Sequence, residues 1–282
     1  MQLEIIRMVQ RLSNPILGNL MEGVTIFAEP ALLAAVFCAI YWCANKRFGQ
    51  YLAFALGVTA CLNGILKDIF RVERIFNRPG FEETGIVSRR VETATGYSFP
   101  SGHTQTAATF WGGVFILAKS PVVRVLTSVL VAAIAFSRIY LGVHYPLDVI
   151  AGLIFGAAVS VFMHRIMIVH KNRALIGFVC VAAIILALVT GVSEDTYRGA
   201  GLLLGVLSGI LFEERLVRFE TGKQPFFQMA LRYATGMVFV YVIYLLSSAL
   251  LPVTMAANAI KYAVIAFLIM GLYPYIFTKL KF

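Results

Sequence analysis

Two histidines stand at the borders of apolar segments, beside residue types that support group transfer. His144 and Asp148 are four residues apart. If Tyr145 to Asp148 form the first turn of a helix, with Pro146 near its N-terminus, the carboxylate can reach the imidazole. A carboxylate so placed fixes the tautomer and orientation of the ring and stabilises its imidazolium form. Since His103 begins another apolar segment, one ring could act as nucleophile while the other protonates the leaving oxygen.

Cations stand at the ends of two other apolar segments. Lys67, Arg71 and Arg74 are spaced by four and three residues, which predicts one helical face. Like charges so placed repel, and each costs more near a bilayer, so an anionic ligand is expected to offset them. Arg138 adds a further guanidinium, and guanidinium groups match phosphate oxygens in pairs. The pattern therefore indicates a site for a tetrahedral oxyanion.

Ser101 and Gly102 stand just before the apolar segment that follows His103. The start of a helix offers unpaired backbone N–H groups to an anion, and glycine lets the backbone approach closely. No group of Asp, Glu, Cys or His has the spacing of a metal site, so the sequence predicts no metal and no cofactor. The cations would then supply the electrostatic role of a metal.

These residues resemble the signature of the type 2 phosphatidic acid phosphatase (PAP2) superfamily, which reads K-x6-R-P, then P-S-G-H, then S-R-x5-H-x3-D. Residues 100–103 are Pro-Ser-Gly-His and complete the second part. Ser137, Arg138, His144 and Asp148 complete the third. The match covers about residues 67–148.

The first part of the signature departs from the family. Lys67 and Arg74 have the right separation, but Ile75 replaces the proline. A second register ends in Arg78 followed by proline, yet it starts from Arg71 in place of lysine. The first register is preferred, because a missing proline costs loop rigidity and no charge.

The resemblance implies roles for the matching residues. His144 would be the nucleophile that forms a phosphohistidine, and Asp148 would orient it. His103 would protonate the leaving group and then activate water. The phosphoryl oxygens would be held by Lys67, Arg74, Ser101, the Gly102 amide and Arg138. Arg71 and Arg78 are supporting candidates.

Composition indicates the elements that must position these residues. The chain has 282 residues, of which 60% are hydrophobic and 13% charged, with a mean hydropathy of +0.83. A soluble domain is less apolar and carries about twice that share of charge. The net charge of +10 fits the basic loops of a membrane protein better than a nucleic-acid surface. We therefore expect an integral membrane protein that binds no nucleic acid.

Apolar segments of spanning length predict an all-α, polytopic helix bundle with about nine spans. They begin near residues 24, 48, 103, 122 and 145 and continue as 174–192, 197–212, 226–251 and 255–277. The N-terminus predicts an interfacial amphipathic helix broken near Pro15. We expect residues 1–170 to form a PAP2-like catalytic core, and residues 171–282 to add transmembrane helices of unknown role.

Basic residues in the short connections predict the orientation in the membrane. By the positive-inside rule their side is the cytoplasm. They are Lys46, Arg47, Lys119, Arg124, Arg165, Lys171, Arg173, Arg215, Arg218, Lys223, Lys279 and Lys281. The long polar loop of about residues 71–98 and both histidines would then face away from the cytoplasm.

The leading functional prediction is a membrane phosphatase acting on a lipid phosphate monoester or diphosphate. Undecaprenyl diphosphate is the first candidate if the cell is bacterial, with phosphatidic acid, phosphatidylglycerol phosphate, lipid A and sphingoid phosphates open. Two alternatives remain at this point. One is a lipid phosphotransferase using the same site, and the other is a non-catalytic protein that binds or transports lipid phosphates. The sequence leaves the oligomeric state open.

Overall fold

Prolines mark where four of the helices begin. Pro15, Pro30, Pro121 and Pro146 each occupy a first helical position, where the fixed φ fits and the missing N–H needs no partner. The computed structural model describes residues 1–222, 224–252 and 254–280, and these ranges contain no strand. The α-helices are α1 (Gln2–Gln10), α2 (Pro15–Thr25), α3 (Pro30–Ala39), α4 (Lys46–Phe70), α5 (Gly102–Leu117), α6 (Pro121–Tyr140), α7 (Pro146–His164), α8 (Arg173–Thr190), α9 (Glu194–Phe212), α10 (Phe226–Leu250), α11 (Met255–Phe267) and α12 (Tyr273–Leu280).

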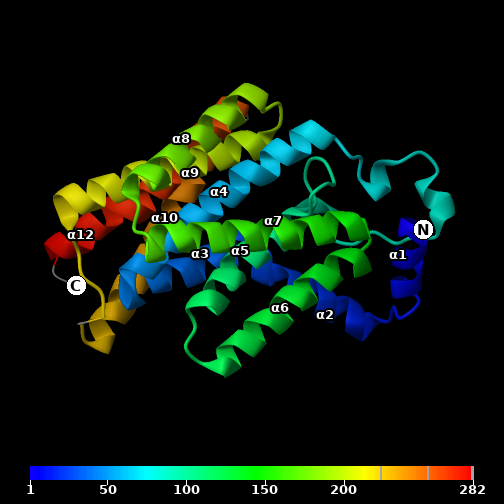
Figure 1. Cartoon of the computed structure of the whole chain (residues 1–282), viewed down its shortest axis with the longest axis horizontal. Helices are drawn as coiled ribbons and strands as arrows, with labels where there is room; N and C mark the ends of the chain where they lie inside the picture. The colour runs from blue at the N-terminus through cyan, green and yellow to red at the C-terminus, as the bar shows by residue number, and fades with distance from the viewer. Residues whose placement is uncertain (223, 253, 281–282) are drawn as a thin grey trace.

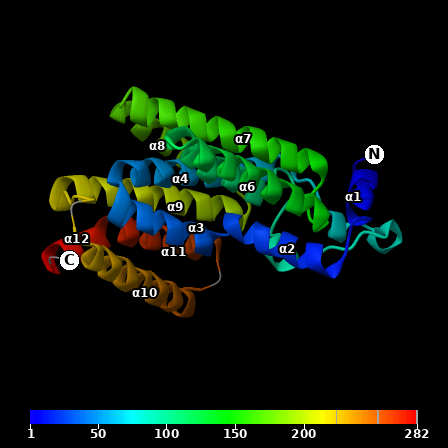
Figure 2. The same ribbon diagram turned by 90° about the horizontal axis from the view of Figure 1, so that it is seen from below.

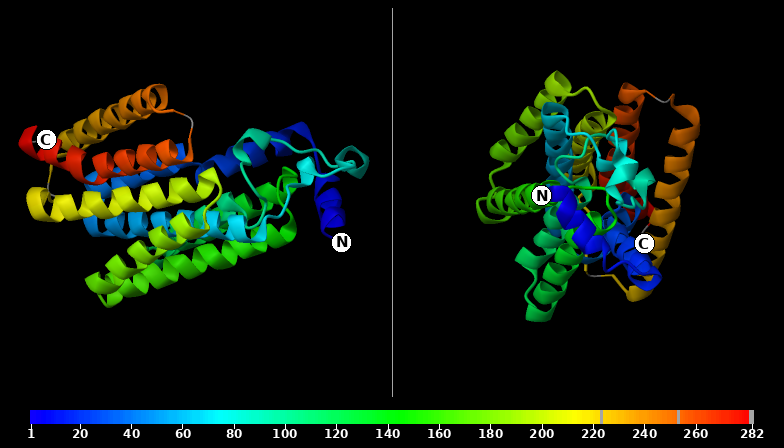
Figure 3. Two further views of the ribbon diagram at one scale, coloured as in Figure 1. Left: turned by 90° about the horizontal axis from the view of Figure 1, so that it is seen from above. Right: turned by 90° about the vertical axis from the view of Figure 1, so that its right-hand side faces the viewer.

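The long helices run mostly along the longest dimension of the molecule (Figures 1 and 2). The N-terminus lies at one end, next to the connection between α4 and α5, and the C-terminus lies at the other end (Figure 1). Helix α1 crosses the end of the bundle instead of running along it (Figure 3). The break between α1 and α2 falls at residues 11–14, as the sequence predicted.

Six helical segments are long and apolar enough to cross a membrane, within the residues that the structure describes. A seventh is counted if the pair Pro15–Ala28 and Pro30–Ala44, bent by 51° at Glu29, is one broken span. The chain is thus an integral membrane helix bundle. The count of about nine is not confirmed, because α5 has only 16 residues and α9 carries charges in its first turns. Both nevertheless lie inside the bundle (Figures 1 and 3).

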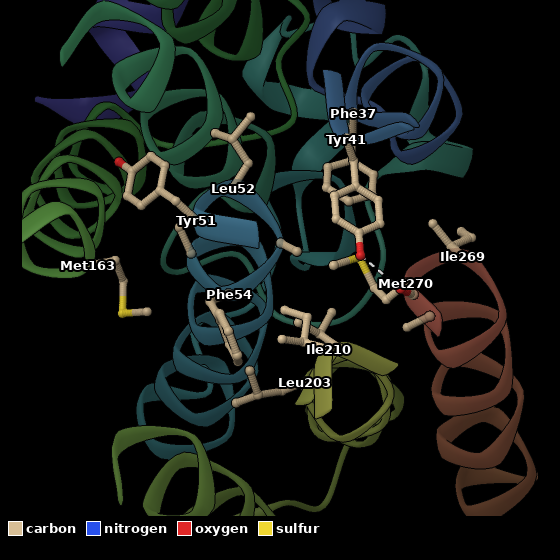
Figure 4. Close-up of a cluster of buried hydrophobic side chains, with 14 of the residues drawn as sticks. Phe37, Tyr41, Tyr51, Leu52, Phe54, Met163, Leu203, Ile210, Ile269 and Met270 are labelled. Atoms are coloured by element: carbon tan, nitrogen blue, oxygen red, sulfur yellow. Dashed lines mark hydrogen bonds between the residues drawn. The ribbon is translucent and has the colours of Figure 1, made fainter. Parts of the chain in front are cut away.

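One large apolar cluster joins helices from both halves of the chain. Side chains from α3, α4, α9 and the segments that follow α3 and precede α12 converge in this cluster. Figure 4 shows five of them: Phe37, Tyr41, Leu52, Leu203 and Met270. The Tyr41 hydroxyl donates a hydrogen bond of 2.8 Å to the Met270 carbonyl oxygen. Because this cluster draws on residues before and after 170, the C-terminal helices share a core with the others. The division at residue 170 stays a prediction.

Helices α9 and α11 approach closely through glycine, since small residues let two helix backbones come near each other. A Cβ added at Gly201 would lie 2.1 Å from the Ala259 carbonyl oxygen. Helix α9 also packs along α4, and so it is held between α4 and α11. The start of α9 is thereby fixed beside the end of α4.

The loop between α4 and α5 is tied to the N-terminal helices. Arg7 donates to the Thr84 carbonyl oxygen at 2.6 Å. The Gln10 amide donates to the Val87 carbonyl oxygen at 2.7 Å and accepts from the Val87 N–H at 3.0 Å. Two ion pairs add to these contacts: Arg89 with Glu22 at 2.7 Å and Arg90 with Glu29 at 3.0 Å.

Several short connections lie together at one end of the bundle. The connections between α3 and α4, α5 and α6, and α7 and α8 lie at the C-terminal end of the molecule (Figure 1). Lys119 and Lys171, which belong to the basic set assigned to the cytoplasmic side, lie in these connections, and Lys46 and Arg173 begin the helices that follow two of them. Lys223 and Lys281, which belong to the same set, lie outside the described residues.

Candidate active site

Four helix ends meet at the N-terminal end of the bundle. Lys67 lies in the last turn of α4, Ser101 caps α5, Arg138 lies in the last turn of α6 and Asp148 in the first turn of α7. All four side chains are buried. Helix α5 packs against α4, α6 and α7. The three motif segments therefore converge at one end, as the sequence predicted.

A glycine on α7 allows the close approach of α5. A Cβ at Gly156 would lie 2.3 Å from the Gln105 carbonyl oxygen. The Ser101 N–H also donates to the Asp148 carbonyl oxygen at 3.0 Å. The N-terminus of α5 is thus held against the first turn of α7.

Asp148 stands beside the His144 ring, which confirms the geometry expected from their spacing. Its Oδ2 lies 3.4 Å from His144 Nδ1. The same oxygen accepts hydrogen bonds from the Ser98 hydroxyl at 2.6 Å and from the Tyr145 N–H at 2.9 Å. The Ser98 hydroxyl is also 3.5 Å from His144 Nδ1. These contacts fix the carboxylate in one orientation.

Arg74 closes the other side of the His144 ring. Its Nη1 lies 3.0 Å from His144 Nε2, and it donates to the Val143 carbonyl oxygen at 3.1 Å. Its remaining N–H groups donate to the carbonyl oxygens of Gly96 at 3.1 Å and Thr95 at 2.7 Å. A guanidinium only donates, so Nε2 must accept, which places the ring proton on Nδ1, towards Asp148.

The His144 ring is neutral at neutral pH. Burial is the main cause that holds the pKa of His144 well below its usual range, and the positive charges of Arg74, Arg138 and Lys67 act in the same direction. A neutral imidazole with its lone pair on Nε2 is the form in which histidine acts as a nucleophile.

This low pKa predicts lower stability in acid. The unfolded imidazole binds a proton below its ordinary pKa of about 6.5, whereas the buried ring stays neutral to lower pH. In that interval the unfolded state holds more protons, so the free energy of unfolding falls as pH falls, by about 1.4 kcal/mol per pH unit for one group. His144→Gln is expected to lose less stability than the wild type between about pH 7 and pH 5. Denaturant unfolding in detergent at both pH values checks this, and equal losses would contradict it.

Arg138 is fully buried and only partly paired. Its Nη1 donates to the Thr25 hydroxyl at 2.8 Å. Its Nε and Nη2 are buried and have no hydrogen-bond partner among the described residues. Unpaired buried N–H groups on a cation are costly, and a bound oxyanion would satisfy both.

His103 faces the same group of cations. Its ring is close enough to Arg138, Lys67 and Arg74 to interact electrostatically with their charges. It interacts in the same way with His144. Its Nε2 is buried without a hydrogen-bond partner in the part of the chain that the structure describes. The two imidazoles thus share one cationic region. The positive charges of Lys67 and Arg74, the two cations of the first motif, interact electrostatically with both rings.

Lys67 has a carboxylate partner that the sequence did not predict. Its Nζ lies 2.6 Å from Oδ2 of Asp195, in the first turn of α9, and donates to the Thr95 carbonyl oxygen at 3.1 Å. The Thr95 carbonyl oxygen therefore accepts from both Lys67 and Arg74.

The expectation that Lys67, Arg71 and Arg74 share one helical face is wrong. Helix α4 ends at Phe70, and Arg71 adopts the left-handed conformation with φ of 47°. The Arg71 side chain is exposed and donates to the Asp68 carbonyl oxygen at 2.9 Å, outside the buried cluster. Arg74 reaches the site because the chain turns back after the helix end.

The other candidates lie around this cluster. The Ser101 hydroxyl accepts from the Thr104 N–H as the cap of α5. Gly102 packs beside the Asn63 amide, whose oxygen would lie 3.3 Å from an added Cβ. Arg78 lies over the Tyr145 ring at 5.1 Å and is exposed, apart from the buried cations. The structure therefore gathers all candidates except Arg71 and Arg78.

Three contributors escaped the sequence reading: Ser98, Thr25 and Asp195. Ser98 stands two residues before the Pro-Ser-Gly-His run. A hydroxyl so close to that run was the feature of the sequence that could have indicated a place in the site. Asp195 precedes an apolar segment, a position that an ordinary solvated helix start also explains. Thr25 carried no signal, since its pairing with Arg138 joins residues 113 apart.

Comparisons with known proteins bear on the same segments. The model of the PAP2 superfamily matches residues 48–172, and that of the PAP2 superfamily phosphatase transmembrane extension matches residues 197–282. An undecaprenyl-diphosphatase of Sulfolobus acidocaldarius is 44% identical over 70 residues, which are 23% of this chain and 32% of that protein. The chain thus spans about a third of that relative.

Two further similarities come from Bacillus subtilis. Phosphatidylglycerophosphatase B is 25% identical over 156 residues, covering 51% of this chain and 71% of that protein. The crystal structure of a transmembrane PAP2-type phosphatidylglycerolphosphate phosphatase has 22% identity and a TM-score of 0.48, and covers 57% of this chain and 82% of that one.

Proposed function

Because the chain belongs to the PAP2 superfamily, we propose that it is a membrane phosphatase that hydrolyses a lipid phosphate or diphosphate. The observation that carries this proposal is the buried His144–Asp148 pair, with Arg74 at 3.0 Å from Nε2, the ring nitrogen that does not face Asp148. Simple binding of a phosphate does not need a neutral imidazole oriented by a carboxylate. This argument favours catalysis over a binding or transport role.

In the proposed reaction, His144 Nε2 attacks the phosphorus of the lipid headgroup. The P–N bond forms as the bond from phosphorus to the leaving oxygen breaks, and His103 supplies the proton that this oxygen takes up. The Nδ1 proton of His144 stays directed at Asp148, which stabilises the cationic ring. His103 then takes a proton from water as the water oxygen attacks the phosphorus, the P–N bond breaks with its electron pair returning to Nε2, and inorganic phosphate and neutral His144 are released.

Lys67, Arg74 and Arg138 are proposed to hold the phosphoryl oxygens. Arg74 donates to His144 Nε2 in the resting site, so its guanidinium has to turn towards a phosphoryl oxygen when the nucleophile attacks. The two unpaired N–H groups of Arg138 fit a pair of phosphoryl oxygens. Cations fixed in a water-poor pocket stabilise the charge that develops on the transferred group. Ser101 and the Gly102 amide would add donors at the start of α5.

The residues of the site address the phosphoryl group, which all candidate substrates share. Undecaprenyl diphosphate is the first candidate, and the name of the Sulfolobus relative supports it. The name of the Bacillus relative supports phosphatidylglycerol phosphate as another candidate. Phosphatidic acid, lipid A and sphingoid phosphates are further candidates. Transfer of the phosphoryl group to another lipid or sugar would use the same phosphohistidine.

A phosphate-release screen tests the proposal. Purified protein in detergent is incubated with each of these lipid phosphates, with and without a chelator, and free phosphate is measured beside labelled acceptor lipids. We expect free phosphate from at least one substrate, at the same rate with chelator. Label found only in an acceptor would identify a phosphotransferase. No release from any of them would reject the proposed function.

We further propose that the site faces away from the cytoplasm. Glu83, in the loop beside the site, is exposed, and Arg173 at the opposite end has a side chain that is 82% exposed. In intact cells, a membrane-impermeant maleimide is expected to label Glu83→Cys and not Arg173→Cys, each in a background without the native cysteines. The reverse pattern would place the site on the cytoplasmic side.

A further inference from the structure

Lys67 is held by a residue of α9, a helix outside the three motif segments. Its Nζ is 2.6 Å from Asp195 Oδ2, and the two side chains are 5% and 19% exposed. A lysine so deeply buried remains a stable cation only if a partner compensates its charge. Arg74 acts on Lys67 as a like charge and increases this need. Asp195 therefore stands where the charge of Lys67 requires a carboxylate.

The position of Asp195 is fixed by the residue next to Lys67. The Asp68 carboxylate accepts from the Val192 N–H at 3.0 Å, the Ser193 N–H at 3.3 Å and the Thr196 hydroxyl at 2.6 Å. Lys67 and Asp68 are consecutive residues of α4. Lys67 binds Asp195 itself, and Asp68 binds residues that come before and after Asp195 in the chain. This double attachment leaves the Asp195 carboxylate little freedom to move away from Lys67.

The pair extends into the candidate active site through Thr95. Its carbonyl oxygen accepts from Lys67 at 3.1 Å and from Arg74 at 2.7 Å. Its hydroxyl donates to Asp195 Oδ1 at 3.4 Å. Since Arg74 contacts His144, one hydrogen-bond network runs from Asp195 to the proposed nucleophile.

A lysine ammonium has three N–H donors. Asp195 and the Thr95 carbonyl oxygen take two of them. We propose that Asp195 is a positioning residue, which keeps Lys67 charged and leaves its third donor for a phosphoryl oxygen. The inference rests on the proposed function. It means that α9, which lies outside the matched PAP2 segment of residues 48–172, completes the phosphate site.

Asp195→Asn tests the inference, with Glu194→Gln as the matched control. Glu194 is the adjacent acid, pairs with Arg198 and is 45% exposed. Calorimetric titration with inorganic phosphate is expected to give a dissociation constant roughly tenfold or more higher for Asp195→Asn. The control is expected to stay within about twofold. Wild-type affinity of a folded Asp195→Asn protein would overturn the inference.

Turnover gives a second readout that a merely structural role would not produce. With dioctanoyl phosphatidic acid as the substrate, Asp195→Asn is expected to raise KM in parallel with the phosphate dissociation constant, and to lower kcat as well, because Lys67 is also proposed to stabilise the transition state. A fall in kcat with unchanged KM would overturn the positioning role.

A double-mutant cycle shows whether Asp195 acts through Lys67. In a Lys67→Met background, Asp195→Asn is expected to cause no further loss of phosphate affinity. An additional tenfold loss would mean that Asp195 acts independently, against the inference. If Asp195→Asn does not fold, Asp195→Glu takes its place. This variant keeps the negative charge but displaces it, so a smaller loss of phosphate affinity is expected. Unchanged affinity would count against the inference.

The two proposals can fail separately. If the wild type releases no phosphate from any lipid but binds inorganic phosphate in a manner that depends on Asp195, the proposed function fails and the inference stands. If the wild type is active and Asp195→Asn matches it, the function stands and the inference fails.

Discussion

His144→Ala is expected to lower the rate of phosphate release by at least about 10³-fold while the protein stays folded. The ring that it removes is buried, with Nδ1 facing Asp148 at 3.4 Å and Nε2 facing Arg74 at 3.0 Å. No other described side chain offers an imidazole in this position. Without it the phosphoryl group has no acceptor, so both the rate and the acid-labile phosphate trapped on the protein should be lost.

The control for this variant is His164→Ala. His164 lies at the other end of α7, where its ring packs edge-on against Tyr51 with centroids 6.3 Å apart. It should retain turnover within a few-fold. Near-normal phosphate release by a folded His144→Ala protein would remove this residue from the mechanism. Acid-labile phosphate still trapped on that variant would point to a different acceptor.

Arg138→Leu is expected to lower kcat/KM by about 10²- to 10³-fold without lowering the temperature of unfolding. The guanidinium is fully buried and pairs with Thr25 through Nη1 alone. A buried charge with unpaired N–H groups contributes little to stability, and replacing buried charged groups by apolar residues often costs no stability. In the proposed reaction the same N–H groups bind the transferred phosphoryl group, so activity and stability should separate.

Initial rates and thermal unfolding in detergent, measured on the same preparation, check this separation. Arg124→Leu provides the control on the same helix, since Arg124 lies near the opposite end of α6 and donates to the Ala118 carbonyl oxygen at 3.0 Å. It should leave both quantities nearly unchanged. If Arg138→Leu lost stability and activity together, Arg138 would be a structural residue.

The parts of the site that follow from local geometry were predictable. The spacing of His144 and Asp148 places them one helical turn apart wherever a helix starts at Pro146, and the structure has that helix. Ser101 caps α5 because serine before an apolar helical segment usually does. The convergence of four helix ends also follows, because successive antiparallel helices return to the same end of a bundle.

The parts that depend on backbone exceptions or distant pairing were not predictable. Helix α4 ends at Phe70, where Arg71 adopts the left-handed conformation, and this turns the Arg71 side chain away from the cluster that contains Lys67. Asp195 is 128 residues from Lys67, and their contact depends on how α9 packs along α4. Spacing carries no information about such a pair. The count of about nine spans is not confirmed, because α5, with 16 residues, is shorter than the segments that meet the length for crossing a membrane.

The contacts of α1 with the loop beside the site bear on how the protein should be handled. Arg7 and Gln10 hold Thr84 and Val87, and Met1 lies only a few residues before them in the chain. A purification tag or fusion partner attached to Met1 would press on the same loop. The C-terminus lies at the far end of the molecule (Figure 1). Tags for expression, immobilisation or fluorescence therefore belong there, where the loop keeps its native anchoring.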